Sequence, residues 1–493
     1  MSSDPGEQPM HSFAEILAWL AQEQQTQTLI VEKIPFAQLD QWQLGGDPLR
    51  LAHRSGRFFT IEGLHVQTDA GPVPCWDQPI IHQPEIGILG IVTSVFGNVR
   101  HYLMQAKVEP GNINGVQLSP TVQATFSNYS RVHRGASTPF LEYFIEPGPG
   151  RIVIDLLQGE QGSRFLRKRN RNMVVALPAD FASQLPTGSR FRWMTLRQIR
   201  RLLKQDNVVN MDARSVLACI PTGYGQGWLE SAAPHDFSFF DDSVAVRSHP
   251  LQPGASCHTT DEIIHWLTDL RSRHHLLLEP RPLDRLEEWE IDDCAIRHQS
   301  GNIFAVIAVS VATHTREIPR WTQPLLHHPG YGLNGFLLQR IDGVVHLLMR
   351  ACIYPGNREI FELGSTVSRS NADLYLGRPH APRYLDAFHT PPPEQIRYAA
   401  VQSEEGGRFY HYQNRYMILE VPPATQLEPS PIHRWMSLAQ VQDFVRHGYV
   451  NIEGRNLLAC LDLSLAQASE PPPERFPLPG SRQPDNTQTW NHP

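Results

Sequence analysis

Two kinds of hydrophobic pattern alternate along the 493-residue chain. Apolar residues at helical spacing follow a Thr or Ser cap at residues 196–205 and 438–447, which predicts a short helix in each place. Short apolar or alternating runs bounded by Gly, Pro and Asn predict strands. The predicted strands are residues 87–97, 101–108, 151–158, 173–177, 335–341, 346–353, 397–402 and 417–421. The pattern therefore indicates an α+β protein with mixed or antiparallel sheets.

The predicted elements come in matched pairs, because the chain repeats itself. EILAWL at residues 15–20 returns as EIIHWL at 262–267, and RWM at 192–194 returns as RWM at 434–436. The offset falls from 247 (Glu15 to Glu262) to 241 (Cys219 to Cys460), as a few short insertions and deletions would produce. We therefore predict two tandem homologous domains, residues 1–225 and 260–465, joined by a linker at 226–259 and followed by a disordered Pro-rich tail at 466–493.

Composition and charge exclude several classes of protein. The chain is 41% hydrophobic, which is typical of a globular protein, and its net charge of −7 gives no electrostatic footprint for nucleic acid. The six cysteines include no C-x-x-C pair, so neither a zinc knuckle nor a disulfide framework is indicated. The N-terminus lacks a signal peptide pattern, and no apolar stretch approaches the roughly 18 residues of a membrane span. A cytoplasmic protein with no membrane partner is expected.

The order of elements within each repeat resembles the Nudix hydrolase fold. A Pro-Gly loop at residues 110–111 and 355–356 precedes later strands and an Arg-Trp-Met-x-Leu segment that leads into a helix. Nudix hydrolases hold Mg²⁺ with several carboxylates on the helix after that loop. The first repeat has no carboxylate in the segment after Pro110-Gly111, and the second has only scattered ones, such as Glu359 and Glu362. Metal-dependent diphosphate hydrolysis is therefore disfavoured, and no metal is expected.

At the scale of the whole chain, longer strings resemble the NDP-hexose 2,3-dehydratase family. They are VQLSPTVQATFSNY from residue 116, GSRFLRKRNRNMVV from 162 and GGRFYHYQNRYMILEV from 406. The resemblance runs from about Phe13 to Leu461 and implies two Nudix-like domains in a homodimer. It also implies a lyase that removes water across C2 and C3 of dTDP-4-keto-6-deoxy-D-glucose in antibiotic sugar biosynthesis. The product, dTDP-3,4-diketo-2,6-dideoxy-D-glucose, would then pass to a 3-ketoreductase or aminotransferase.

Such a reaction needs a general base, a group that stabilises the enolate and an acid for the leaving hydroxyl, but no redox cofactor. Arg164 and Arg408, beside Gly162 and Gly406, suit a diphosphate, although an ion pair with Glu160 or Glu404 is the structural alternative. The aromatic platforms Trp76 and Trp321 suit the thymine, whereas core packing is expected for Trp19, Trp42, Trp193 and Trp435. The substrate-binding candidates are Trp76, Trp321, Gln158, Gly162, Ser163, Arg164, Arg383, Gln402, Ser403, Gly406, Gly407, Arg408, Arg434 and Trp435.

Positions where the repeats differ suggest which copy is catalytic. Gln161 is aligned with Glu405, and Leu166-Arg167 with Tyr410-His411. The second repeat thus holds the titratable groups, so we expect Glu405, Tyr410 and His411 to act as acid and base, with Glu404 in reserve. The basic run RFLRKRNRN at residues 164–172 of the first repeat could bind a second nucleotide sugar or a subunit, or be a solvated surface. A nucleotide-sugar pyrophosphohydrolase and a non-catalytic nucleotide-sugar binding protein remain the alternatives.

Overall fold

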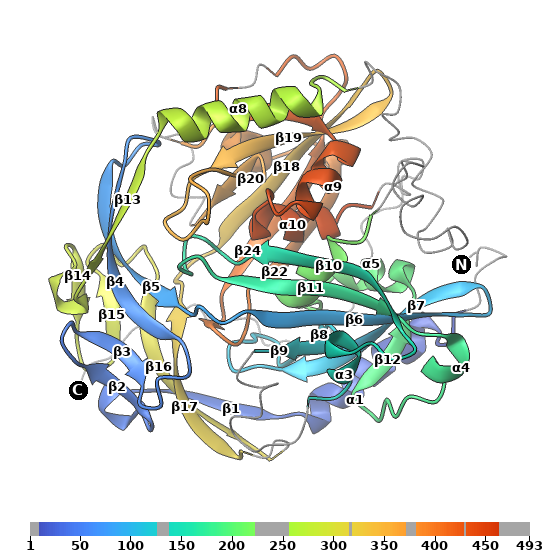
Figure 1. Ribbon diagram of the computed structural model, residues 1–493, viewed down its shortest axis with the longest axis horizontal. Helices are drawn as coiled ribbons and strands as arrows, with labels where there is room; N and C mark the ends of the chain where they lie inside the picture. The colour runs from blue at the N-terminus through green and yellow to red at the C-terminus, as the bar shows by residue number, and fades with distance from the viewer. Residues whose placement is uncertain are drawn as a thin grey trace.

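The computed structural model describes residues 9–125, 138–221, 256–314, 318–370, 381–427 and 430–462. Within them the chain forms four β-sheets and a set of helices (Figure 1), which confirms the predicted α+β class. The predicted tail and residues 226–255 of the predicted linker lie outside the described residues.

Two larger sheets, one in each repeat, contain all the predicted strands. In the first repeat the order is β10 (Arg151–Gly159), β11 (Arg169–Ala176), β6 (Gly87–Phe96), β7 (Val99–Val108) and β12 (Phe191–Met194), with β8 (Val116–Ser119) on β7 and β9 (Val122–Ala124) on β6. In the second it is β20 (Glu362–Gly364), β19 (Val344–Cys352), β18 (Gly332–Ile341), β24 (Gln413–Glu420) and β22 (Ile396–Ser403), with β21 (Val367–Arg369) on β18 and β25 (His433–Ser437) on β19. Both sheets contain one parallel pair, β6 with β11 and β18 with β24, so they are mixed as predicted.

The two predicted helices are present as α5 (Leu196–Leu203) and α9 (Leu438–Arg446). Each begins with a capping box, because the hydroxyl of Thr195 or Ser437 accepts a hydrogen bond from the backbone three residues later. They lead into α6 (Met211–Leu217) and α10 (Ile452–Ala459), which pack against each other and so join the two repeats. Shorter helical turns are α3 (Glu142–Ile145), α4 (Ala179–Ala182), η1 (Phe36–Gln38), η4 (Leu283–Arg285), η6 (Leu385–Phe388) and η7 (Pro393–Gln395).

The two smaller sheets exchange their edge strands between the repeats. One holds β2 (Trp42–Gly45), β3 (Arg50–His53), β4 (Thr60–Thr68) and β5 (Cys75–His82) of the first repeat and β13 (Leu276–Arg281) of the second. The other holds β14 (Trp289–Ile291), β15 (Ala295–His298), β16 (Ala305–Thr313), β17 (Arg320–His327) and β23 (Phe409–Tyr410) of the second repeat and β1 (Leu29–Ile34) of the first. Each exchanged strand follows its repeat's first long helix, α1 (Phe13–Thr26) or α8 (Thr260–Arg273), and Figure 1 shows β13 running from α8 to the edge of β4.

The exchange is regular. β1 pairs antiparallel with β16 from Leu29 opposite Thr313 to Ile34 opposite Ala308, and β13 pairs in the same way with β4. At the end of the second pairing a Cβ on Gly63 would lie 2.4 Å from the Arg281 carbonyl oxygen, so only glycine fits there. The repeats are therefore successive in sequence but interlocked in space.

Hydrophobic cores are shared between the repeats for the same reason. One core combines Trp42, Phe59 and Phe165 of the first repeat with their second-repeat counterparts Trp289, Phe304 and Phe409. The expected core packing of Trp19, Trp42 and Trp193 is confirmed, since all three are at least nine-tenths buried. Cys219 and Cys460 are buried too, and burial raises the pKa of Cys219 to about 12, which is typical of inert core thiols.

Candidate functional site

The Pro-Gly-Asn loop of each repeat inserts into the other repeat. The Gly356 N–H donates to the Gly162 carbonyl (2.6 Å), and the Gly111 N–H donates to the Gly406 carbonyl (2.7 Å). A Cβ on Gly356 would lie 1.7 Å from the Phe165 carbonyl oxygen, and one on Gly111 1.6 Å from that of Phe409. Glycine is needed because two backbones touch. Gly162 and Gly406, which we expected to approach a diphosphate, are instead covered by the side chains of Asn357 and Asn112.

A cavity of about 220 Å³ lies where the second repeat's loop meets the first repeat. The first repeat contributes the ends of β10 and β11 and the segment between them, and the second contributes the loop, Arg271 of α8 and residues 447–449 before α10. The lining residues are Leu157, Gly159, Glu160, Arg167, Lys168, Arg169, Arg271, Gly356, Asn357, Arg358, Glu359, Glu362, His447, Gly448 and Tyr449. Five Arg or Lys side chains in so small a space are suited to a diphosphate.

Glu160 is the buried carboxyl group of this cavity. One oxygen accepts a hydrogen bond from the Asn170 amide (2.7 Å), and the other has no partner. Burial and then the negative charge of Glu405 raise the pKa of Glu160 to about 7, against the opposing charges of Arg455 and Lys168. Glu160 can therefore gain or lose a proton near neutral pH.

Glu362, at the start of β20, is the second such group. Burial raises its pKa to about 7, although Arg455 and the Arg358 N–H, which donates to the carboxylate (3.3 Å), act in the opposite direction. The cavity thus combines cations with two carboxyl groups poised for proton transfer.

Glu405 does not line the cavity, but its charge acts on Glu160, and it belongs to a buried acidic cluster with residues of the first repeat. Burial raises its pKa, the charge of Arg408 opposes this, and the charge of Glu109 adds to it. Asp212 of α6 belongs to the same cluster, since burial and then Glu405 and Glu160 raise its pKa well above the usual range. Only one position of the cluster, Glu405, was predicted as catalytic from the sequence.

The alignment of the repeats explains this cluster. Gln161 donates a hydrogen bond to Glu404, which also accepts one from the Asn414 amide (2.5 Å). Gln161 is aligned with Glu405, and Glu404 with Glu160. The equivalent pair therefore consists of two carboxyl groups, near enough for the charge of Glu405 to raise the pKa of Glu160. The amide–carboxylate contact between Gln161 and Glu404 thus has, as its counterpart, a pair of like charges, Glu405 and Glu160.

Tyr410 and His411 lie in a different cluster. Their rings stack with centroids 4.1 Å apart, His327 lies 5.9 Å from Tyr410, and the Lys33 ammonium is 5.2 Å from the centre of the Tyr410 ring. Burial, with help from Lys33, lowers the pKa of His411 to about 4. The four predicted catalytic residues are thus divided between two environments.

Most of the predicted binding residues in the matched segments 158–164 and 402–408 form contacts that join the two repeats. The Gln158 amide donates to the Val445 carbonyl (2.6 Å), and that of Gln402 donates to the Leu203 carbonyl (2.8 Å). The Ser403 hydroxyl bonds the Gln117 side chain, whereas the carbonyls of Ser163 and Gly407 accept from their neighbours Arg164 and Arg408.

Arg164 and Arg408 each lie over a phenylalanine of the other repeat, 4.1 Å from the centre of Phe304 and 4.2 Å from that of Phe59. No ion pair joins Arg164 to Glu160 or Arg408 to Glu404 among the pairs found in the described residues, and neither arginine lines the cavity.

The remaining candidates lie outside the cavity lining. Trp76 and Trp321 are partly buried, and each indole N–H donates to the glutamine two residues later (both 2.8 Å). The Arg434 guanidinium lies 4.9 Å from the centre of the Trp266 ring, and that of Arg383 lies 5.2 Å from the centre of Tyr384. Trp435 is 7% exposed within a hydrophobic core, where packing accounts for it.

Several cavity residues were not predicted as site residues from the sequence, namely Arg271, Arg358, Glu362 and His447. They come from three separate segments of the second repeat (α8, residues 358–362 and the residue after α9), which only the interlocked fold brings to the first. The basic run at residues 164–172 did carry a signal, since Arg167, Lys168 and Arg169 line the cavity. In the described part of the chain no group of three or more His, Cys, Asp or Glu side chains is arranged to hold a metal ion. Nor does any described helix have the length and apolar character that crossing a membrane requires.

Comparison with known proteins agrees with this architecture. The family model described as NDP-hexose 2,3-dehydratase matches residues 13–220 and again residues 260–461. A dTDP-4-dehydro-6-deoxy-alpha-D-glucopyranose 2,3-dehydratase of Saccharopolyspora spinosa is 43% identical over 450 residues, which cover 91% of this chain and 90% of that protein. An enzyme of the same description from Amycolatopsis orientalis is 42% identical over 460 residues, covering 92% of this chain and 91% of its own. With both repeats matched and nine-tenths of each relative covered, the chain belongs to the NDP-hexose 2,3-dehydratase family.

Proposed function

We propose that the protein is a hydro-lyase that removes water across C2 and C3 of dTDP-4-keto-6-deoxy-D-glucose, giving dTDP-3,4-diketo-2,6-dideoxy-D-glucose. The activity by which the relatives are described supports this substrate. The observation that carries the assignment of the site is the cavity of about 220 Å³, in which cations suited to a diphosphate surround a carboxyl group with a pKa of about 7.

Substrate binding would use the two sides of the cavity differently. Arg167 and Arg169 of the first repeat and Arg358 of the second offer guanidinium groups to the diphosphate. Tyr449 is the aromatic side chain of the lining, so we assign it, rather than Trp76 or Trp321, to the thymine. The sugar would then extend toward Glu160.

The carboxyl groups of Glu160 and Glu405 are suited to act as a pair. Two like charges close together favour a state with one shared proton, so one member can be a base while the other is an acid. The ionised carboxylate takes the proton from C3, which the adjacent C4 ketone has made acidic, and leaves an enolate. The C2 hydroxyl takes the proton of the other carboxyl group and departs as water, and the resulting C2–C3 enol gains a proton at C2 as its oxygen becomes the 3-ketone.

Positive charge near the reacting carbons would stabilise the enolate. Lys168 lines the cavity, is 6% exposed and donates to the Asn170 side chain (2.9 Å), which holds its ammonium group close to Glu160. Burial lowers the pKa of Lys168, whereas the charge of Glu160 raises it. Tyr410 and His411, in their separate cluster, receive no proton-transfer step.

The wider setting rests on the family resemblance. We propose a cytoplasmic homodimer that serves antibiotic sugar biosynthesis, whose diketo product is used by a 3-ketoreductase or an aminotransferase.

One assay distinguishes the dehydratase from its alternatives. The protein is incubated with dTDP-4-keto-6-deoxy-D-glucose in EDTA, together with a 3-ketoreductase and NADPH, and the products are identified by mass spectrometry. A dehydratase gives a sugar nucleotide that has lost one water. Release of dTMP only when Mg²⁺ replaces EDTA would identify a pyrophosphohydrolase, and bound but unchanged substrate would identify a binding protein.

Variants in the same assay test the site. Glu160→Gln and Glu405→Gln should each lower turnover at least about 100-fold, because each removes one member of the acid–base pair. Gln161→Glu, at the position aligned with Glu405, and Glu359→Gln, an exposed carboxylate of the lining, should retain turnover within a few fold. Equal losses in Glu405→Gln and Gln161→Glu would rule out the asymmetric site.

A further inference from the structure

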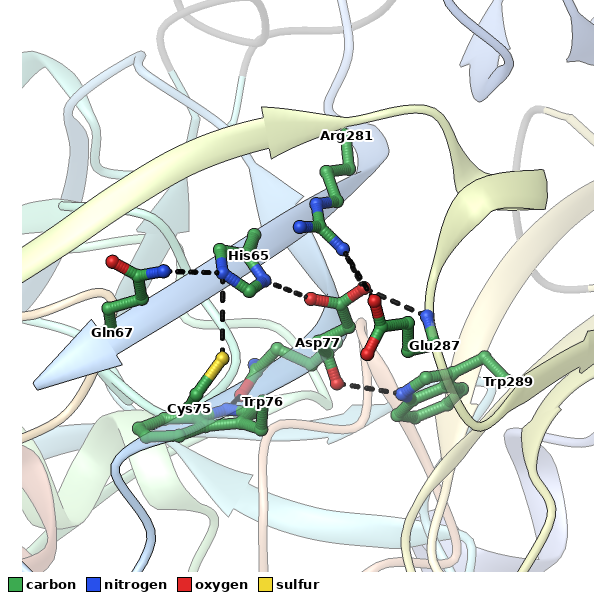
Figure 2. A network of polar contacts seen from close by, with 9 residues as sticks. His65, Gln67, Cys75, Trp76, Asp77, Arg281, Glu287 and Trp289 are labelled. Atoms are coloured by element: carbon green, nitrogen blue, oxygen red, sulfur yellow. Dashed lines mark hydrogen bonds and ion pairs between the residues drawn. The ribbon is translucent and has the colours of Figure 1, made fainter.

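A second cluster of reactive side chains lies on the first repeat's small sheet, away from the cavity. His65 and Gln67 of β4 are paired across the sheet with Asp77 and Cys75 of β5, so all four side chains share one face. The His65 Nε2 atom lies 3.5 Å from the Cys75 Sγ and 3.1 Å from the Gln67 amide nitrogen, and the His65 Nδ1 atom lies 2.5 Å from an Asp77 oxygen. Figure 2 shows this line from thiol to imidazole to carboxylate.

Asp77 is held in place by the second repeat. Its other carboxylate oxygen accepts hydrogen bonds from the Arg281 guanidinium (2.9 Å) and the Glu287 N–H (2.8 Å). Burial would raise the pKa of Asp77, but these bonds and the one to His65 lower it overall, so the group is ionised. An ionised Asp77 can only accept a hydrogen bond from His65, so the His65 Nδ1 atom carries the donated proton. The lone pair of Nε2 is then directed at Gln67 and Cys75.

The second repeat shows that the fold does not require this cluster. At an offset of 245 residues, His65, Cys75 and Asp77 are replaced by Ser310, Arg320 and Thr322. The same strand-exchanged sheet forms there, and the Thr322 hydroxyl accepts the Asp40 N–H (2.7 Å) in the place where Asp77 accepts that of Glu287. A hydroxyl therefore suffices for the structural contact, and the carboxylate oxygen that orients His65 is additional.

Of the three residues in the line, only the thiol of Cys75 reaches solvent. Asp77 and His65 are 7% and 5% exposed, whereas Cys75 is exposed at the start of β5. A thiol in contact with solvent, a base in contact with the thiol and a buried group that orients the base form the arrangement of an activated nucleophile.

We infer that Cys75 is a nucleophilic thiol, activated by His65 and Asp77. It is a site of modification by small electrophiles, and hydrogen peroxide is its physiological reactant. The sulfur attacks one peroxide oxygen and the O–O bond breaks. The thiol proton passes to His65 and then to the departing hydroxide, which leaves as water, so that Cys75 becomes a sulfenic acid, oxidised by two electrons, while the peroxide is reduced.

Alkylation rates test the activation. The full-length protein is treated with iodoacetamide at pH 7, and peptide mass spectrometry follows Cys75 and the partly exposed Cys294 separately. Cys75 should react at least about tenfold faster than Cys294, and His65→Gln should remove that advantage while leaving the Cys294 rate unchanged. Equal rates for the two cysteines, or a Cys75 rate that His65→Gln does not alter, would overturn the inference.

Peroxide tests the modification itself. After exposure to hydrogen peroxide with dimedone present, the dimedone adduct should form at Cys75 in the wild type and be lost at least tenfold in His65→Gln. Asp77→Thr, which installs the residue of the second repeat and keeps a hydroxyl for the Glu287 N–H, should lower the adduct with little change in melting temperature. Adducts spread equally over Cys75, Cys257 and Cys294 would contradict a built site.

Discussion

The proton affinity of Glu160 leads to a quantitative prediction about stability. Its pKa rises from 4.5 to about 7 in the folded protein, so the folded state binds a proton that the unfolded state has released. The stabilisation is fully present below pH 4.5 and is lost as the pH rises to about 7, and a rise of this size corresponds to about 3 kcal/mol. Glu160→Gln cannot titrate and keeps an oxygen for the Asn170 amide. The free energy of unfolding of the variant, relative to wild type, should therefore increase by up to about 3 kcal/mol between pH 4.5 and pH 8.

Urea unfolding at pH 4.5, 6 and 8 and constant ionic strength measures this difference. Burial also raises the pKa values of Glu362 and Glu453 to about 7, but both groups are present in wild type and variant and cancel in the comparison. Glu290→Gln, an exposed carboxylate on β14, is the control and should show no pH-dependent difference. If the difference between Glu160→Gln and wild type stays constant across this range, the argument from burial and like charge is refuted. The same variant should be more stable at pH 8 yet inactive.

Three further predictions follow from the interlocked loops and strands. Gly356→Ala should lower the free energy of unfolding by roughly 2–4 kcal/mol, because the new Cβ would lie 1.7 Å from the Phe165 carbonyl oxygen. In the same urea titration Gly159→Ala should cost little, since the nearest atom to its new Cβ is 4.0 Å away. Arg358→Ala should raise KM for the nucleotide sugar about tenfold with a smaller change in kcat, since a guanidinium is lost from the cavity; an unchanged KM would exclude it from binding. Fragments 1–240 and 241–493 should be insoluble apart but recover an active complex when expressed together, and independent folding of either fragment would contradict the strand exchange.

The elements of the larger sheets were predictable because each follows from a local pattern. The capped runs after Thr195 and Ser437 and the apolar strands, such as residues 87–97, are sufficient to identify their helices and strands. The strand exchange was not predictable from the sequence. The alternation of apolar and polar residues in β1 and β13 is equally compatible with pairing inside their own repeat and with pairing to the other repeat.

The site was predicted only in part for the same reason. Comparison of the repeats drew attention to Glu405 and to the basic run with Arg167, but Arg358 and Glu362 join them only across the interlocked loops. Glu160 was considered as an ion-pair partner, whereas its burial and the charge of Glu405 give it a pKa suited to proton transfer. Such effects depend on neighbours that are 200 or more residues away in sequence.

The exchanged strands also bear on how the protein arose. In the observed arrangement each small sheet is completed by a strand of the other repeat, so a single repeat that kept this arrangement would form a strand-exchanged dimer with a second copy. Joining two copies in one chain makes that pairing intramolecular and independent of concentration. It also releases the halves from identity, because a symmetric dimer carries the same residue twice. The glutamine at 161 aligned with the glutamate at 405, and the histidine at 65 aligned with the serine at 310, are differences that a symmetric dimer of identical chains could not carry.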